Sequence, residues 1–554
     1  MIYTAYQKFS VLQWIDFDPE KVLVNGFDSE YAADYLGINQ TEVCKGNVLY
    51  IDIIKKNTKD TEYIDECCRV TDEKYLISAE KCDDGLHIFI TVSCRKSLFR
   101  ALCRIKGMIN DKKFFIGDAE DYPLFAERGY IEGFYGNPWS FENRKMMIEL
   151  LSFYGMNTHY YAPKDDPYHR DKWDELYPEK ELSELSAMLE ICKENFVDFY
   201  YCIAPGLSMQ YSSEEDFEKL ICKVNQLYDI GIRNFGLLVD DIPENLYFEQ
   251  DKIAFDGDAV NAHIYLCNKF YSRIKALSSE CKLTVCPLQY HGNGDEYYIS
   301  KLGKGLSGGI KLFWTGKNIC SQEITVREAV IFEYSTNRKP LYWDNFPVND
   351  AEMYNEMHIG YIDGREKDLC RYSEGIISNT MEYALSSRIP LLTVCDYLWN
   401  PAVYNGFESW QKACEIILGE EKETVMPFFD NLLTSCLKVE NSPMLNVCLN
   451  DAQQKYFDGD IDGARSVLIG YIMKLEKCCK YLETARNPML SELTPWAEKQ
   501  KIALDLIKSA ASILDDNSEK SKENTRVLLK NYLNHPKTLC DFSLQSFAER
   551  MLTL

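Results

Sequence analysis

Histidine is scarce in this sequence, with 7 among 554 residues, and none is arranged as H-E-x-x-H. Cysteine is plentiful, with 21 residues, yet no C-x-x-C pair occurs. Zinc sites in proteins commonly draw their ligands from such closely spaced pairs. The sequence therefore favours neither a structural nor a catalytic metal, and we expect no metal site and no other cofactor.

A long apolar segment is also missing. No run of about 18 apolar residues occurs, which disfavours a transmembrane helix, and the start MIYTAYQKFS has no basic region before an apolar stretch. The odd number of cysteines and the adjacent pairs Cys67–Cys68 and Cys478–Cys479 are not typical of a disulfide framework. We expect a cytoplasmic protein with reduced thiols and no membrane partner; export after removal of a signal segment is the alternative.

The chain has no excess of basic residues. Lys and Arg number 61 against 86 Asp and Glu, which gives a net charge of −25. Nucleic acids and anionic membranes select basic surfaces, so we expect neither as a partner. Aromatic residues make up 13% of the chain, with 37 Tyr, and such rings stack on sugars as well as fill cores. The composition does not indicate an oligomeric state.

The length of the chain exceeds what one hydrophobic core supports, so several domains are expected. Residues 1–122 show two strand patterns and one helix pattern, over Asn47–Lys56, Leu86–Ser93 and Arg95–Ile109. They predict a small N-terminal α/β domain. Residues 401–554 show helix patterns interrupted by a polar loop at 515–526, which predicts a C-terminal helical bundle.

Residues 123–400 alternate short apolar strands with helices. The strand candidates are Gly129–Phe134, Thr158–Tyr161, Asp198–Ile203, Phe235–Asp240, Leu283–Cys286, Ile310–Phe313, Pro340–Trp343 and Gly375–Ser378. Strands and helices alternating in this number predict a catalytic TIM (β/α)8 barrel, so the expected fold class is α/β. An open doubly wound sheet is the alternative, but no G-x-G-x-x-G motif comes directly after any of these strands.

Polar and aromatic residues gather just after the predicted strands, where a barrel forms its active-site mouth. Asp240 and Asp241 stand at the end of the fourth strand. Neighbours in a regular strand point to opposite faces, so both carboxylates serve one site only if the chain leaves the strand there. His159 lies in the middle of the second strand, and we expect it to be a hydrogen-bonded barrel residue.

An adjacent carboxylate pair is poorly placed to act as the acid and nucleophile of an ordinary retaining glycosidase. Those carboxyl groups flank the sugar about 5–5.5 Å apart. One Asp could instead protonate the glycosidic oxygen while the other holds a 2-acetamido group that attacks the anomeric carbon and closes an oxazoline. Intramolecular attack reaches effective molarities of about 10⁵–10⁸ M, which removes the need for a protein nucleophile.

Four strings occur in order and at barrel spacing: RGYIEGFYGNPW, NTHYYAPKDDPYHRDKW, VDDI and WDNFPVND. Together they closely resemble glycoside hydrolase family 84, the O-GlcNAcase and hyaluronidase-like β-N-acetylglucosaminidases. The resemblance implies an N-terminal α/β domain, a catalytic barrel and a helical domain. The partners that it implies are glycans or glycoproteins that carry β-GlcNAc.

The resemblance also implies roles for individual residues. Asp240 would orient and polarise the acetamido N–H, and Asp241 would act as general acid and then as general base. The substrate-binding residues would be Gly133, Lys164, Tyr290, Trp343, Asn345, Asp350 and Asn379. Tyr290 and Asn345 would contact the acetamido group, and Asp350 would hold the 4- and 6-hydroxyls.

The expected activity is that of a retaining exo-β-N-acetylglucosaminidase, similar to protein O-GlcNAcase. Asn137, Val239 and the dipeptide Leu288-Gln289 depart from the residues usual in the family, which affects the expected aglycone preference. An endo-hyaluronidase of the same family is one alternative, disfavoured by the negative net charge and by Asp350. An inactive glycan-binding protein on the same barrel is another, disfavoured because the catalytic set is retained.

Overall fold

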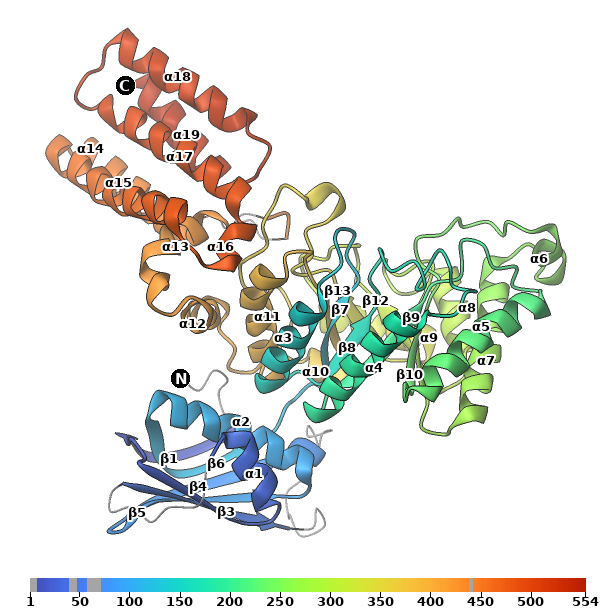
Figure 1. Cartoon of the computed structure of the whole chain (residues 1–554). Helices are drawn as coiled ribbons and strands as arrows, with labels where there is room; N and C mark the ends of the chain where they lie inside the picture. Colours follow the sequence, from blue (N-terminus) through green and yellow to red (C-terminus); the bar gives the residue numbers. More distant parts are fainter. Residues whose placement is uncertain (1–6, 39–46, 57–70, 434, 438–441) are drawn as a thin grey trace.

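The computed structural model describes residues 7–38, 47–56, 71–433, 435–437 and 442–554. It shows a small sheet domain, a barrel and a group of helices in chain order (Figure 1). Cys67 and Cys68 lie outside the described residues, and the cysteines within them are free thiols. Within the same ranges, no helix is both long enough and apolar enough to cross a bilayer.

The N-terminal domain is a six-stranded mixed sheet packed against a long helix. Its elements are β1 (Lys8–Asp16), β2 (Lys21–Gly26), α1 (Ser29–Leu36), β3 (Val48–Lys55), η2 (Thr71–Glu73), β4 (Tyr75–Cys82), β5 (Gly85–Val92), α2 (Arg95–Asp111) and β6 (Lys113–Asp121). The strand order is β1-β6-β4-β5-β3-β2. Along β5, Leu86, Ile88 and Ile90 are buried at every second position and pack in one core with α2.

The central region is a closed barrel of eight parallel strands, so the open-sheet alternative is wrong. The strands are β7 (Glu127–Glu132), β8 (Thr158–Tyr161), β9 (Asp198–Ile203), β10 (Asn234–Leu238), β11 (Lys282–Cys286), β12 (Ile310–Trp314), β13 (Leu341–Asp344) and β14 (Gly375–Asn379). The barrel closes where β14 pairs with β7 in parallel. Each predicted strand overlaps one of these, but the fourth ends at Leu238, before the two aspartates.

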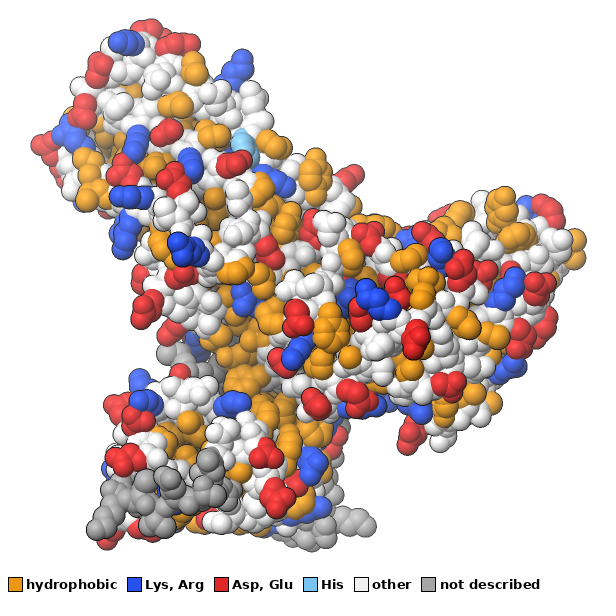
Figure 2. Space-filling view, viewed as in Figure 1, with side chains coloured by type: hydrophobic (Ala, Val, Ile, Leu, Met, Phe, Trp, Pro, Cys, Tyr) orange, Lys and Arg blue, Asp and Glu red, His pale blue; other side chains and the backbone are white. Residues whose placement is uncertain are grey.

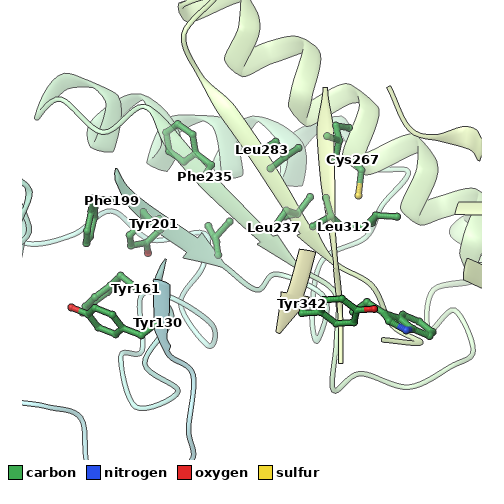
Figure 3. Packing of buried hydrophobic residues seen from close by; sticks show 14 of the residues in the cluster. Tyr130, Tyr161, Phe199, Tyr201, Phe235, Leu237, Cys267, Leu283, Leu312 and Tyr342 are labelled. Atoms are coloured by element: carbon green, nitrogen blue, oxygen red, sulfur yellow. The ribbon is translucent and has the colours of Figure 1, made fainter. Parts of the chain in front are cut away.

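Alternation along the strands divides the barrel core into two layers. Residues such as Ile131, Tyr160 and Tyr200 fill the interior, whereas their neighbours Tyr130 and Tyr161 belong to the outer cluster that also contains helix side chains. Figure 3 shows part of that outer cluster. The surrounding helices are α3 (Phe141–Phe153), α4 (Glu179–Glu194), α5 (Glu214–Asp229), α6 (Glu249–Ala254), α7 (Ala259–Leu277), α8 (Tyr297–Gly305), α9 (Val326–Thr336), α10 (Leu369–Tyr372) and α11 (Ala384–Trp399).

Helices make up the C-terminal region, as predicted. They are α12 (Gly406–Leu418), η4 (Gly419–Glu421), α13 (Lys422–Asn431), α14 (Pro443–Phe457), α15 (Ile461–Thr484), α16 (Pro488–Glu492), α17 (Thr494–Ser512), α18 (Glu519–Asn534) and α19 (Asp541–Thr553). The loop expected at 515–526 is wrong from Glu519 onward, because α18 begins at that residue. Ser518 accepts a hydrogen bond from the backbone N–H of Ser521, and Arg526 pairs with Glu519 and Glu523, so capping and ion pairs support a polar helix.

Hydrophobic side chains gather where the N-terminal domain meets the barrel (Figure 2). Trp399, at the end of α11, packs in the core of the N-terminal domain. Its indole N–H donates to the Asp121 carboxylate at 2.9 Å. The sheet domain is therefore joined to the barrel region by a shared core.

His159 departs from its predicted environment. Its ring is fully buried and stacks on Tyr130 with 4.6 Å between ring centroids. Neither ring nitrogen has a hydrogen-bond partner, so the prediction of a hydrogen-bonded histidine is wrong. Burial lowers the pKa of His159 to about 3, helped by the positive charge of Arg144. The folded protein therefore holds a neutral, unpaired imidazole at this position.

Replacing His159 with Phe should leave stability at pH 7.5 unchanged or raise it, because a phenyl ring fills the stack without buried nitrogens. The variant should gain on the wild type as the pH falls. Below about pH 6.5 the unfolded chain binds a proton at His159 and the folded chain does not, so acid destabilises the wild type by up to about 1.4 kcal/mol per pH unit. Urea unfolding at pH 7.5 and 5.5 measures both effects.

His263 offers a matched control for this substitution. It is also buried and neutral, with its pKa lowered to about 4 by burial, but its Nδ1 lies 2.7 Å from the Tyr298 hydroxyl. His263→Phe should gain the same resistance to acid yet lose stability at pH 7.5, because the buried Tyr298 hydroxyl loses its imidazole partner and keeps only the Leu288 N–H. An advantage of His159→Phe that does not change with pH would contradict the explanation.

Candidate active site

The predicted site residues meet in one cavity of about 500 Å³ at the carboxyl ends of the barrel strands. The cavity is lined by each of Gly133, Lys164, Asp240, Asp241, Tyr290, Trp343, Asn345, Asp350 and Asn379. These residues come from the loops and strand ends of β7, β8, β10, β11, β13 and β14. The barrel thus brings together side chains that are far apart in the chain, as the strand-end positions predicted.

The two aspartates reach the same cavity because the chain leaves the strand geometry. β10 ends at Leu238, and Asp241 has a φ of 52°, in the left-handed region that few non-glycine residues adopt. Strained backbone of this kind is concentrated at functional sites. The Asp240 side chain is nearly buried, at 8% exposure, whereas Asp241 is 32% exposed. One carboxylate is therefore enclosed by protein, and its neighbour is open to the cavity.

Lys164 supplies the positive charge next to the pair. Its Nζ lies 3.5 Å from an Asp240 oxygen and 3.8 Å from an Asp241 oxygen, and its side chain is 6% exposed. Burial lowers the pKa of Lys164, but attraction to the two aspartates outweighs burial and the net pKa is raised. The lysine stays charged and compensates the negative charge at this end of the cavity.

Two tyrosines donate hydrogen bonds to Asp241. The hydroxyl of Tyr135 is 2.8 Å from Oδ2 and that of Tyr290 is 3.3 Å from Oδ1. Arg170 donates to the Tyr135 hydroxyl at 3.1 Å and to the Asp241 carbonyl at 3.2 Å. Burial and then the neighbouring aspartates raise the pKa of Tyr290, so its hydroxyl keeps its proton for donation. The position of the exposed carboxylate is thus fixed from both oxygens.

The opposite wall is a network of amides around an indole. The Asn345 amide oxygen accepts from the Trp343 indole at 3.0 Å and from the Asn379 amide at 2.9 Å, and its nitrogen donates to the Ile319 carbonyl. The Asn379 amide oxygen is buried and has no partner. An ordered amide with one unpaired acceptor suits a ligand that brings a hydroxyl or N–H donor.

Gly133 allows this wall to approach the first strand. A Cβ built at Gly133 would lie 2.7 Å from Cζ2 of Trp343 and 3.1 Å from the Asn379 amide oxygen. Those contacts are too short for any side chain larger than hydrogen. Gly133 therefore acts through close packing, and its backbone is the part that faces the cavity.

Asp350 lies in the loop after β13. It accepts a hydrogen bond from the backbone N–H of Tyr135 at 2.8 Å, which joins the loops after β7 and β13. Burial raises the pKa of Asp350, although that N–H acts in the opposite direction. Further along, the C-terminal helices hold the same loop through hydrogen bonds from Trp496 and Thr538 to the Asn355 carbonyl. The helical region therefore positions a loop of the site.

Several lining residues were not predicted from the sequence. They are Tyr135, Cys286, Thr315, Ile319, Cys320, Val348, Ala351, Glu352 and Met353, with Arg170 just behind Tyr135. Tyr135 follows Gly133 by two residues in a motif that was recognised, so its position was available. The contact of Tyr135 with Asp241 could not be predicted, because the sequence of a loop does not specify the direction of its side chains.

A larger groove lies far from this chemistry. It has a volume of about 1020 Å³ and runs between the N-terminal sheet and α12, lined by residues such as Trp14, Asp111 and Lys412. We place the active site in the smaller cavity because a strained carboxylate pair meets a buried lysine and two hydroxyl donors there, and the described lining of the larger groove has no such combination. Two groups of metal-ligating side chains occur among the described residues, and both lie outside this cavity lining.

Comparison with known proteins identifies the family to which the chain is similar. A family model described as beta-N-acetylglucosaminidase matches residues 128–431, more than half of the chain. The protein O-GlcNAcases of Rattus norvegicus and Mus musculus are each 30% identical over 320 residues, which are 56% of this chain and 33% of those proteins. The chain therefore spans about a third of the length of these curated relatives.

Two solved structures are similar over most of the chain. The structure of CpGH84B is 27% identical with a TM-score of 0.84 and covers 100% of both chains. A variant of the Thermobaculum terrenum O-GlcNAc hydrolase is 30% identical with a TM-score of 0.72, covering 77% of this chain and 94% of its own. The chain belongs to the β-N-acetylglucosaminidase family, glycoside hydrolase family 84.

Proposed function

We propose that the protein is a retaining exo-β-N-acetylglucosaminidase that removes terminal β-linked GlcNAc from glycoproteins or glycans, in the manner of a protein O-GlcNAcase. The observation that carries the proposal is the adjacent pair Asp240–Asp241, turned by a left-handed residue into one cavity beside Lys164. Carboxylates on one side of a sugar cannot flank it, so the nucleophile is the substrate's own acetamido carbonyl.

Asp240 is suited to hold that nucleophile. Its carboxylate is almost fully enclosed and lies beside the Lys164 ammonium, so it presents a fixed negative charge in a site of low water access. The acetamido N–H would donate to it. As the carbonyl oxygen attacks the anomeric carbon, positive charge builds on the amide, and the carboxylate stabilises it.

Asp241 is suited to move the proton. It is four times as exposed as Asp240, and Tyr135 and Tyr290 orient its two oxygens. As a general acid it protonates the leaving oxygen while the oxazoline forms. As a general base it then removes a proton from the water that opens the ring, which leaves the product with retained configuration.

The remaining residues bind the sugar. Tyr290 and Asn345 contact the acetamido group, and Trp343 forms a flat apolar wall. Gly133, Lys164 and Asn379 surround the 3-hydroxyl region, where the unpaired Asn379 oxygen accepts a hydrogen bond. Asp350, tied to the neighbouring loop, accepts from the 4- and 6-hydroxyls of a terminal ring. Contacts to the 3-, 4- and 6-hydroxyls together leave no ring position free for a preceding sugar, so this arrangement supports exo action.

The N-acyl group of the substrate provides the test. A 4-methylumbelliferyl β-GlcNAc reporter should be hydrolysed, and replacing acetyl with fluoroacetyl and trifluoroacetyl should slow the reaction progressively, because fluorine withdraws electrons from the attacking carbonyl. NMR should detect the β-anomer of the sugar as the first product. A rate that does not depend on the acyl group would rule out substrate assistance, and shortening of hyaluronan would favour an endo-acting enzyme instead.

A further inference from the structure

A group of soft donor atoms lies behind one wall of the cavity. Met353 lines the cavity, and its sulphur is 3.3 Å from Cys436 Sγ and 4.0 Å from Cys320 Sγ. Next to Met353, Glu356, His358 and Cys436 bring a carboxylate oxygen, a ring nitrogen and a thiol sulphur within 4.8 Å of one another. This combination of donors is the type that zinc binds in proteins.

The three residues are held in place without a metal. The ring Nε2 of His358 lies 2.7 Å from Oε2 of Glu356, and the backbone N–H of Cys436 donates to the same oxygen at 2.9 Å. His358 is 2% exposed, so its ring cannot swing away, whereas Cys436 is exposed and leaves a path for an ion. A fixed ring, a carboxylate next to it and an accessible thiol meet the requirements of a metal site.

We propose that Glu356, His358 and Cys436 form a Zn²⁺ site, with the Met353 sulphur or a water molecule in the fourth position. A thiolate and an imidazole disfavour Mg²⁺ and Ca²⁺, which take oxygen ligands. The carboxylate disfavours Cu(I), which prefers sulphur and nitrogen. On binding, the ion replaces the thiol proton of Cys436, which passes to the solvent, and a Zn–S bond forms.

The observed spacing is close to what such a site needs. With metal bonds of about 2.0–2.3 Å, two donors on one tetrahedral zinc lie about 3.3–3.8 Å apart, the longer value applying to two sulphurs. The contact of 3.3 Å between Cys436 and Met353 needs a small change, and the His358–Glu356 contact of 2.7 Å has to open by somewhat more. A rotation of the Glu356 side chain, which is 19% exposed, supplies that movement.

The second group of potential ligands is less suited to a metal. Cys82, Asp84 and His87 lie at the hairpin between β4 and β5. Cys82 and Asp84 are exposed, and the His87 ring is stacked on Tyr50 with 4.4 Å between centroids. Metal binding would have to immobilise two exposed side chains, which costs conformational entropy. This group therefore serves as the internal control for the proposed site.

The ion would link two parts of the fold. Glu356 and His358 belong to the connection after β13 that also carries Asp350, and Cys436 follows α13 of the helical region. A metal at this point would add a cross-link to the hydrogen bonds by which Trp496 and Thr538 hold the same loop. Zinc should therefore raise the thermal stability of the full-length protein, since a ligand that binds only the folded state stabilises it.

The test is a zinc titration of the full-length protein, freed of metal by a chelator and kept reduced without added thiols. Calorimetry should report one Zn²⁺ per chain, and Co²⁺ in its place should give the near-ultraviolet absorption band of a thiolate–metal bond. Cys436→Ser and His358→Gln should each weaken binding at least about tenfold and abolish the rise in Tm. Cys82→Ser, which removes a thiol from the hairpin group, should bind zinc like the wild type.

Three results would overturn the proposal: no zinc bound by the wild type, equal binding by wild type and Cys436→Ser, or binding lost only in Cys82→Ser. Cys436 is exposed, so its replacement by Ser should leave the Tm of the metal-free protein unchanged. If His358→Gln lowers that Tm, Glu356→Gln takes its place in the comparison. These readouts do not depend on glycosidase activity, so they remain valid if the proposed reaction is wrong.

Discussion

Asp241→Asn and Asp240→Asn should differ in how the rate depends on the leaving group. Asp241→Asn should slow hydrolysis of a GlcNAc–serine linkage by about 10²–10⁴-fold, the usual contribution of a general acid. It should slow a reporter with an acidic phenol much less in the first step, because that leaving group departs without a proton. Asp240→Asn should slow both substrates by about 10²–10³-fold, since the oxazoline loses its stabilising charge in either case.

Asn is the right replacement because it separates charge from backbone geometry. Asp241 has a φ of 52°, and Asn adopts this region as readily as Asp, whereas Ala would add strain. Asp256 provides the matched control: it has a φ of 55° in the connection after the same strand, and its side chain is exposed. Asp256→Asn should keep wild-type rates on both substrates.

Steady-state kinetics on one protein-linked and one activated substrate make the measurement. Equal losses in Asp241→Asn on both substrates would assign this residue to charge stabilisation and not to proton transfer. Wild-type turnover by both variants on the protein-linked sugar would refute the mechanism. A buried residue paired with Lys164 and an exposed one oriented by two tyrosines predict the opposite outcome.

The barrel and most of the cavity residues could be predicted from the sequence, because both follow from periodic or local patterns. Strand ends in a parallel barrel converge on one face, so the position of a residue just after a strand is enough to bring it to the site. The motifs added Asp350, whose position within the loop after β13 has no periodic signal. Its assignment depended on resemblance, and the structure places it in the same cavity.

What the sequence could not supply were contacts decided by distant elements. The hydrogen bond from Tyr135 to Asp241 requires knowing the direction of two loop side chains. The lack of any partner for His159 depends on which outer-layer rings surround it. The metal ligands proposed here come from a loop and from Cys436, far along the chain, so motif spacing gave no sign of them.

Glu73→Gln should destabilise the junction between the N-terminal domain and the barrel by about 3–5 kcal/mol, the cost of breaking a buried ion pair. Glu73 is fully buried and accepts from Arg100 at 2.7 Å and from Arg128 at 2.6 Å. Burial acts to raise the pKa of Glu73, but attraction to the two arginines outweighs it and the net pKa is lowered. The substitution leaves two buried guanidinium groups without their counter-charge.

The sign of the pH dependence follows from the lowered pKa. Above about pH 4.3, where Glu73 is ionised in the unfolded chain as well, the stabilising charge is fully present. Below that pH the unfolded chain binds a proton first, so the advantage of the wild type over Glu73→Gln should shrink. The difference in Tm, on the order of 10 °C at pH 7, should therefore be smallest in acid.

Asp18→Asn is the control, because the pair of Asp18 with Lys112 is about 60% exposed on both sides and should contribute less than about 1 kcal/mol. Equal stability losses in the two variants would show that burial does not set the strength of the Glu73 cluster.

The junction between the N-terminal domain and the barrel also affects the active site. Arg128 lies in β7, and Gly133 follows that strand directly. Because the strand held by Glu73 leads into the cavity, we expect Glu73→Gln to lose activity at the temperature where this junction opens, before the barrel as a whole unfolds.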